Sequence, residues 1–447
     1  MSDRRGGGKR WGGGRTAKRS AGPTTARDAA AVALGELAER MPDVGAIELP
    51  SDGLTPRDAA LAADVYRLGA ARWLTCEAVA GPFLKGGLGR LDPAMRGVLV
   101  AGVSQLLFRP DLAAYAVVDE AVESAKRVVH PRAAGMANAV MRRVAERVAG
   151  HDESEAWSGE AATLPWGSGG VVRLSETVGV KGEGDAGSAG WVAAATGVPA
   201  RLLEAWREAY GWDEAVRLGV HAAGAAPVIV QPDGQVWRAD EHPGGLRAYL
   251  AEHPEQRVQD PTAAAVLDTV SQRWGSWGFG PPPEAVWDAC AGRGTKARQM
   301  RAVFEGTEVW AYDPTAGHRR DLGAIDGVRV GRPPAGRAGL VLFDVPCSNT
   351  GVLARRPEAR HRYSAAHVRE LVELQRAIVE EHLPVVGDRA VVVYATCSIE
   401  PAENRAQADW LATRTGRRIV EDRLTTPGGG EERYHDGGYF AVLGPAG

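Results

Sequence analysis

The chain contains few cysteines, namely Cys76, Cys290, Cys347 and Cys397 among 447 residues. That number cannot support a disulfide scaffold, and no two of the four are spaced as a Cys-x-x-Cys metal knuckle. Reduced thiols in the cytoplasm fit this usage best. His361 lacks companion ligands at a useful spacing, so the sequence predicts no metal site.

Long apolar runs are missing as well, and the basic N-terminal segment is not followed by the apolar stretch of a signal peptide. We therefore expect neither membrane insertion nor secretion. The hydrophobic fraction of 44% and the charged fraction of 24% are ordinary for a soluble folded protein. A chain of this length is expected to form two or three domains, and we expect a monomer.

Net charge is small, −3 overall, but unevenly spread. Residues 1–27 carry eight basic side chains and one acidic one, a net charge of +7, which leaves −10 for the rest. This Gly-rich segment has too few apolar residues to fold, and we expect a disordered basic tail. It suits contact with phosphates of a nucleic acid, and a solubilising leader is the alternative.

Hydrophobic periodicity divides the remaining chain into segments. Residues 28–150 show helical spacing and predict an all-α bundle, with helices over 25–41, 56–73, 93–108, 117–129 and 131–148. Residues 151–190 lack periodicity and are expected to be a linker. Residues 191–260 predict a small α/β RNA-binding module, with strands at 227–231 and 257–259.

From residue 261 to 447, predicted strands alternate with predicted helices, which indicates an α/β domain with a parallel, doubly wound, Rossmann-like sheet. We expect strands at 285–290, 308–312, 339–343, 389–394 and 438–443, and helices at 262–273, 295–304, 365–382 and 402–413. Cys347 and Cys397 each follow one of these buried strands. Ligands bind beyond the carboxyl ends of such strands, so we interpret the two cysteines as paired active-site thiols rather than small buried hydrophobes.

Another strand runs into a G-x-G-x-x-A turn that opens a helix, Gly292-Arg293-Gly294-Thr295-Lys296-Ala297. The glycines permit a tight turn and close approach of a ligand, and Asp313 follows the next strand, where a carboxylate can hold ribose hydroxyls. NAD and S-adenosylmethionine both suit this geometry. Hydride transfer needs no thiol pair, however, whereas methylation of carbon 5 of cytosine needs a thiolate addition at carbon 6, helped by an acid such as Asp344 at N3.

At these residues the sequence resembles the RNA (cytosine-5) methyltransferases of the Sun or RsmB-like family. The matching segments are Asp344-Val345-Pro346-Cys347-Ser348-Asn349-Thr350-Gly351, Thr396-Cys397-Ser398 and Cys290-Ala291-Gly292-Arg293-Gly294-Thr295-Lys296. The resemblance implies that Cys397 is the nucleophile, that Cys347 assists product release, and that Asp344 also takes part in catalysis. It further implies S-adenosylmethionine contacts from Cys290, Ala291, Gly292, Arg293, Gly294, Thr295, Lys296, Asp313 and Asp344. DNA cytosine methyltransferases use the Pro-Cys cysteine instead, so Cys397 argues for RNA.

The helical segment also resembles a NusB-like RNA-binding domain, through residues 56–62 and 136–143. This combination of domains implies methylation of small-subunit (16S) ribosomal RNA. Thr295 stands where the family usually has glycine, and no acidic residue follows the predicted third strand at 328–334. These departures favour the alternative of a non-catalytic ribosome-assembly protein that binds RNA. The basic run Arg355, Arg356, Arg360, His361 and Arg362 predicts phosphate or base contact at the rim of the site, or a solvated charged face.

Overall fold

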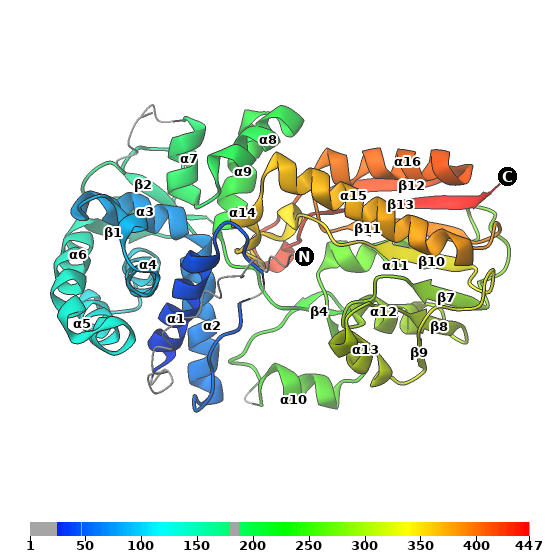
Figure 1. Cartoon of the computed structure of the whole chain (residues 1–447), viewed down its shortest axis with the longest axis horizontal. Coiled ribbons are helices and arrows are strands. Elements are labelled where there is room, and N and C mark those ends of the chain that lie inside the picture. Colours follow the sequence, from blue (N-terminus) through cyan, green and yellow to red (C-terminus); the bar gives the residue numbers. More distant parts are fainter. Residues whose placement is uncertain (1–24, 46, 168, 179–186, 243, 447) are drawn as a thin grey trace, which may run out of the picture.

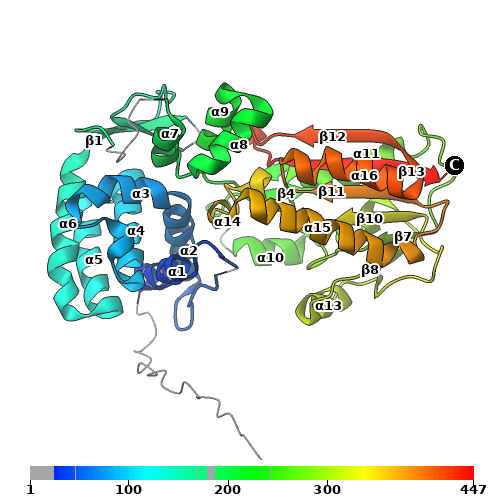
Figure 2. The ribbon, with the colours of Figure 1, turned by 45° about the horizontal axis from the view of Figure 1, so that its top comes forward.

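The computed structural model describes residues 25–446 apart from 46, 168, 179–186 and 243. Most of the predicted basic tail therefore lies outside the described residues. Its last three residues belong to the first helix, because Thr25 caps that helix by accepting a hydrogen bond from the Asp28 amide. A helical lobe and a sheet-containing lobe lie side by side, as the two views show (Figures 1 and 2).

The helical lobe is built around a central buried helix, α4. Its helices are α1 (Ala26–Arg40), α2 (Pro56–Ala71), α3 (Trp73–Ala80), α4 (Pro93–Phe108), α5 (Ala114–Ser124) and α6 (Ala134–Arg147). Small residues let α1 and α4 approach closely, since a Cβ added to Gly97 would lie 2.1 Å from the Ala31 carbonyl oxygen. The sequence correctly predicts α4 over 93–108. The predicted helix over 56–73 covers α2 but ends at Trp73, so α3 is not predicted.

Residues 151–190, expected to be a linker, contain most of a three-stranded antiparallel sheet. Its strands are β1 (Val148–Asp152), β2 (Thr163–Trp166) and β3 (Gly170–Leu174), in the order β1-β3-β2. Leu164, Val172 and Leu174 are buried in the core of the helical lobe. The strands are too short to give a periodic pattern in a stretch rich in Gly and Ser, which explains the difference from the prediction.

A second group of helices connects the two lobes: α7 (Ala189–Thr196), α8 (Ala200–Tyr210) and α9 (Trp212–Ala223). Their buried side chains share one core with Leu353, Tyr363 and Ile399 of the larger lobe. A small sheet follows, formed by β4 (Ile229–Gln231), β5 (Gln235–Val236) and β6 (Arg257–Val258), with α10 (Gly245–Glu252) inserted before β6. β4 and β6 coincide with the predicted strands.

The larger lobe has a seven-stranded sheet in the order β12-β13-β11-β10-β7-β8-β9. The strands are β7 (Ala285–Asp288), β8 (Glu308–Ala311), β9 (Val328–Val330), β10 (Leu340–Asp344), β11 (Val391–Thr396), β12 (Arg417–Thr425) and β13 (Gly438–Ala446). β7 to β11 pair in parallel, whereas β13 is antiparallel to both of its neighbours. The predicted Rossmann-like fold is confirmed.

Helices cover both faces of this sheet (Figure 2). They are α11 (Pro261–Arg273), α12 (Thr295–Val303), α13 (Ala316–Gly323), α15 (Ala365–His382) and α16 (Arg405–Thr415). The short helix α14 (Ala359–Arg362) lies instead at the boundary with the helical lobe. Successive residues of one strand serve opposite faces. Leu342 packs with the core of α11 and α12, and Phe343 packs with that of α15 and α16. No helix among the described residues has the length and apolar character needed to cross a membrane.

Candidate active site

The two predicted thiols meet at the carboxyl edge of the sheet. β10 and β11 are adjacent parallel strands in which Asp344 is paired with Ala395, so the loops after them run side by side. The Sγ atoms of Cys347 and Cys397 lie 3.3 Å apart. Cys347 is buried, and Cys397 is half-buried and lines a cavity. This relationship is the one expected from two strand-end cysteines.

Asn349 completes the immediate surroundings of the thiols, and sequence reasoning missed it. Its side-chain oxygen lies 3.3 Å from Cys397 Sγ, and its side-chain amide donates to the Cys347 carbonyl at 2.8 Å. With φ of +61° it is the one non-glycine residue in the described part of the chain with positive φ. Asparagine tolerates this left-handed conformation, so an Asn two residues after a strand-end cysteine is a usable signal.

The electrostatic environment makes the two thiols unequal. A hydrogen bond from Cys347 lowers the pKa of Cys397, and the cations Arg356 and Lys296 act in the same direction, against burial and Asp344. The pKa of Cys347 is raised well above its ordinary value by its hydrogen bond with Cys397 and by burial. The electrostatic environment therefore favours the thiolate at Cys397 over a thiolate at Cys347.

Lys296 connects the glycine loop to the strand that leads to Cys347. Its Nζ donates to Asp344 Oδ2 at 2.7 Å. Burial alone would lower the pKa of Lys296, but the Asp344 carboxylate raises it overall. Lys296 is therefore a fixed cation that faces both Asp344 and the thiols, rather than a neutral amine.

The loop 290–296 forms a concave backbone surface at the end of β7. Gly292 and Gly294 have φ of +53° and +91°. A Cβ on Gly294 would lie 2.4 Å from Ile325 Cδ1, whereas one on Gly292 would meet open space. Thr295 begins α12 without a positive φ, so its side chain causes no strain in the turn. Arg293 points into solvent, with Asp321 3.8 Å away.

Two carboxylates, Asp288 at the end of β7 and Asp313 after β8, help to decide whether S-adenosylmethionine fits this site. Asp313 holds the loop to β8 by accepting from the amide nitrogens of Gly292 at 3.1 Å and Thr315 at 2.8 Å, and His318 Nδ1 lies 3.0 Å away. A carboxylate has about four acceptor positions, so one remains for a ribose hydroxyl. Asp288 is buried, and its Oδ2 has no hydrogen-bond partner within the described residues. Burial and the nearby Asp344 raise the pKa of Asp288 to about 7.

An unpartnered acid of this kind favours a cationic ligand nearby, and the methyl donor carries both a sulfonium and an ammonium group. The residues present therefore fit the cofactor. Cys290 lies in the same loop, but burial, followed by the charge of Asp288, raises its pKa well above the ordinary value. Cys290 is therefore a neutral contact residue and not a third nucleophile.

A cavity of about 350 Å³ joins these groups. Cys290, Gly292 and Lys296 line it together with Asp344 and Cys397, and residues of α11, of the end of β12 and of the start of β13 line it as well. Thus the glycine loop and the nucleophilic thiol open into one space. Within the described residues no cluster of three or more His, Cys, Asp or Glu side chains could hold a metal ion.

The basic run after Cys347 lies only partly at the rim of the site, which corrects part of the prediction. Arg355 and Arg356 line the cavity, whereas Arg360, His361 and Arg362 contact carbonyl oxygens of the helical lobe. Arg360 is fully buried, and its guanidinium donates to the carbonyl oxygens of Ala71 at 2.6 Å and Ala222 at 2.7 Å. His361 Nε2 lies 3.1 Å from the Ala70 carbonyl oxygen. Burial lowers the pKa of Arg360 to about 9, which leaves it charged at neutral pH. Of the five residues of this run, only Arg356 is exposed.

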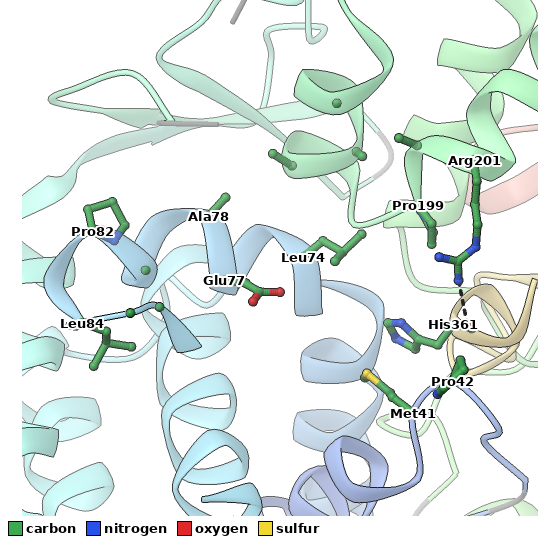
Figure 3. A pocket seen from close by; sticks show the side chains of 17 residues that line it. Met41, Pro42, Leu74, Glu77, Ala78, Pro82, Leu84, Pro199, Arg201 and His361 are labelled. Carbon is green, nitrogen blue, oxygen red and sulfur yellow. Dashed lines mark hydrogen bonds between the residues drawn. The ribbon is translucent and has the colours of Figure 1, made fainter. Parts of the chain in front are cut away.

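These contacts form the domain joint, which we define as Arg72, Arg201, Arg360 and His361. Arg72 is also buried and donates to the carbonyl oxygens of Ala195 and Pro165. Arg201 donates to the His361 carbonyl oxygen at 2.8 Å (Figure 3). The joint borders a cavity of about 1050 Å³, lined by largely apolar groups of α3, α7 and α8. Glu77 projects into this space from α3, and none of the residues predicted for catalysis lines it.

Comparison with known proteins agrees with the fold. The family model described as 16S rRNA methyltransferase RsmB/F matches residues 330–431, and that of the NusB family matches residues 24–146. The putative methyltransferase Rv1407 of Mycobacterium tuberculosis is 30% identical over 388 residues, 79% of each chain. Ribosomal RNA small subunit methyltransferase B of Thermus thermophilus is 29% identical over 333 residues, 70% of this chain and 68% of that protein.

The crystal structure of PH0851 shares the fold, with a TM-score of 0.62 at 17% identity, over 93% of this chain and 98% of that chain. The family match and the relatives place the chain among the methyltransferases. The chain belongs to the RsmB/F methyltransferase family, and its helical lobe is a NusB-family domain. Both predicted resemblances are confirmed.

Proposed function

We propose that the chain transfers a methyl group from S-adenosylmethionine to carbon 5 of a cytosine in small-subunit ribosomal RNA. The observation that carries this proposal is the 3.3 Å separation of Cys347 and Cys397 beside Lys296 and Asp344. The names of the relatives support ribosomal RNA as the substrate. The helical domain, the module at 191–260 and the basic tail are proposed to hold that RNA for the catalytic region at 261–447.

In the proposed reaction the Cys397 thiolate adds to carbon 6 of the cytosine, and Asp344 hydrogen-bonds at N3, so that electron density moves to carbon 5. When bound, S-adenosylmethionine supplies an electrophilic methyl group, which carbon 5 takes. The cofactor is held by the loop from Cys290 to Lys296 and by Asp313. The proton that Asp344 passes to N3 comes from Lys296, whose Nζ donates to Asp344 Oδ2 at 2.7 Å, and it returns to Lys296 by the same route when N3 loses it at product release.

Release requires that carbon 5 lose its proton while the bond between carbon 6 and Cys397 breaks. The negative sulfur of Cys397 contributes to keeping Cys347 protonated. Once Cys397 is bonded to carbon, that charge is gone, and Cys347 loses its proton to solvent more readily, which is the one proton that the overall methylation releases. We propose that Cys347 then removes the carbon 5 proton, and the electron pair reforms the ring double bond as Cys397 leaves. Within one turnover Cys397 would thus act first as nucleophile and then as leaving group, and Cys347 first as a neutral thiol and then as a base.

The test is methylation of unmodified 16S ribosomal RNA with S-adenosylmethionine labelled on its methyl group, followed by nucleoside analysis. We expect label in 5-methylcytidine at one position, which bisulfite sequencing locates. Label in another nucleoside would refute the proposed carbon. Absence of transfer together with RNA binding, and no titration signal with millimolar S-adenosylmethionine, would instead favour the non-catalytic assembly protein. Thr295, the residue that favoured that alternative, gives it no support because its backbone is unstrained.

A further inference from the structure

Behind the two thiols lies a buried carboxylate that the proposed reaction does not use, Glu403. It is fully buried, in the short turn Pro401–Glu403 between Cys397 and α16. Among the described residues it forms no ion pair. Burying a charge away from water is costly unless hydrogen bonds compensate it, so the contacts of Glu403 need an explanation.

Glu403 accepts hydrogen bonds from the residues that follow both cysteines. Its Oε1 accepts from the Ser348 amide at 2.9 Å, and its Oε2 accepts from the hydroxyls of Ser348 and Ser398, the latter at 2.6 Å. Ser348 follows Cys347 and Ser398 follows Cys397, so one carboxylate joins the two thiol loops. The two serine hydroxyl oxygens lie 3.1 Å apart as a result.

Neighbouring side chains reinforce this connection. Gln375 of α15 donates to both Glu403 Oε1 at 3.0 Å and the Pro346 carbonyl oxygen at 3.1 Å, immediately before Cys347. Asn404 donates to the Ser398 carbonyl oxygen at 2.9 Å and accepts from the Thr396 hydroxyl at 2.6 Å, on either side of Cys397. The main chain on both sides of each cysteine is therefore fixed by hydrogen bonds centred on residues 403 and 404.

We propose that Glu403 is a positioning residue that sets the separation of the Cys347 and Cys397 sulfur atoms. The inference rests on the proposed function, in which Cys347 has to reach a proton beside the carbon that Cys397 attacks. A carboxylate suits this task because it offers acceptors on two sides of one rigid group, each toward a different loop. A glutamine side chain at position 403 would place an N–H donor against at least one of the N–H or O–H groups from which Glu403 now accepts a hydrogen bond.

The test uses Glu403→Gln in the full chain, with Glu400→Gln as the matched control. Glu400 is buried in the same segment, but its carboxylate accepts from Trp206 at 3.1 Å and Tyr363 at 3.2 Å. Ser398→Ala provides a second variant. It removes the side-chain hydrogen bond from the Cys397 loop to Glu403 and leaves the hydrogen bonds from Ser348 to Glu403 in place. Thermal unfolding establishes that each variant is folded.

Thiol separation is measured without RNA by phenylarsine oxide, whose arsenic bonds to two nearby thiols with release of one water. Peptide mapping by mass spectrometry identifies the two sulfur atoms. We expect the unsubstituted protein and Glu400→Gln to capture one equivalent across Cys347 and Cys397. For Glu403→Gln and Ser398→Ala we expect capture at least ten-fold slower, with alkylation of Cys397 by iodoacetamide undiminished.

Single-turnover methylation is measured in parallel, and we expect a loss of at least ten-fold for Glu403→Gln with unchanged RNA affinity. Capture and methylation within two-fold of the unsubstituted protein would overturn the role of Glu403. If the unsubstituted protein fails to methylate RNA, the proposed function fails. The capture rates then still decide whether Glu403 sets the thiol separation.

Discussion

Cys347 and Cys397 are fifty positions apart in the chain, yet their sulfur atoms are 3.3 Å apart at the ends of two paired strands. From this contact we predict opposite outcomes for the two alanine variants. Cys397→Ala should abolish methyl transfer, because the attacking thiolate is lost. Cys347→Ala should bond to RNA but release it slowly, giving an adduct that survives denaturing electrophoresis. Trapping by Cys397→Ala instead would show that the two roles are reversed.

The exposed cation Arg356 is predicted to tune the reactivity of Cys397. Its charge contributes to lowering the pKa of that thiol, so the thiolate persists to lower pH than in an ordinary cysteine. Replacing it in Arg356→Gln should raise the pKa and move the acidic limb of the rate profile to higher pH. The rate of Cys397 alkylation between pH 5 and 10 measures this directly. Arg369→Gln, an exposed change on α15, should leave the profile in place, and equal profiles for both variants would contradict the role of Arg356.

Gly294 is predicted to be irreplaceable in the cofactor loop. Gly294→Ala combines a φ of +91° with a Cβ only 2.4 Å from Ile325, so the loop has to shift. We expect the affinity for S-adenosylmethionine, measured by calorimetry, to fall at least ten-fold. Gly306→Ala is the control, because Gly306 also has positive φ but open space around its Cβ position. It should lose about 1 kcal/mol of stability and little affinity. If both variants lost the same affinity for S-adenosylmethionine, the strain of a positive φ, and not the contact with Ile325, would account for the loss.

Arg360 is predicted to hold the two lobes together. Arg360→Met removes a buried guanidinium that donates to carbonyl oxygens of the helical lobe, of α9 and of its own loop. The orphaned carbonyls should cost about 3 kcal/mol or more of unfolding free energy in urea titration. We also expect the unfolding transition in urea to separate into two, because without this contact the two lobes no longer unfold together. Arg369→Met should unfold as the unsubstituted chain does, and a single unshifted transition for Arg360→Met would count against the joint.

The sequence predicted the parallel sheet and the meeting of Cys347 with Cys397, because carboxyl ends of parallel strands share one edge. Short elements and edge strands were harder to predict from the sequence. β12 is an edge strand whose residues after Arg417 are exposed or half-buried, and its charged residues gave no strand signal. In the sequence Thr295 is a departure from the family, and its place at the start of α12 without a positive φ is known only from the structure.

Arg360 and Glu403 could not be placed from sequence. A run of Arg and His is ordinarily solvated, and its burial here depends on carbonyl groups nearly 300 residues away in the chain. Glu403 likewise has its partners on separate loops, so local sequence contains no sign of its four donors. Tertiary context, rather than residue type, decides whether such a charge faces water.

The domain joint also carries a consequence for how this protein can change. Arg201, Arg360 and His361 contact main-chain carbonyl oxygens across the joint, and Arg72 contacts those of Ala195 and Pro165 while its guanidinium lies over the Phe108 ring. A carbonyl oxygen is present whatever residue occupies the position. Substitutions on the partner helices are therefore tolerated at the joint as long as the four residues themselves remain. An insertion or deletion near Ala70 and Ala71 moves the carbonyls out of reach, so the length of α2 is constrained far more tightly than its composition.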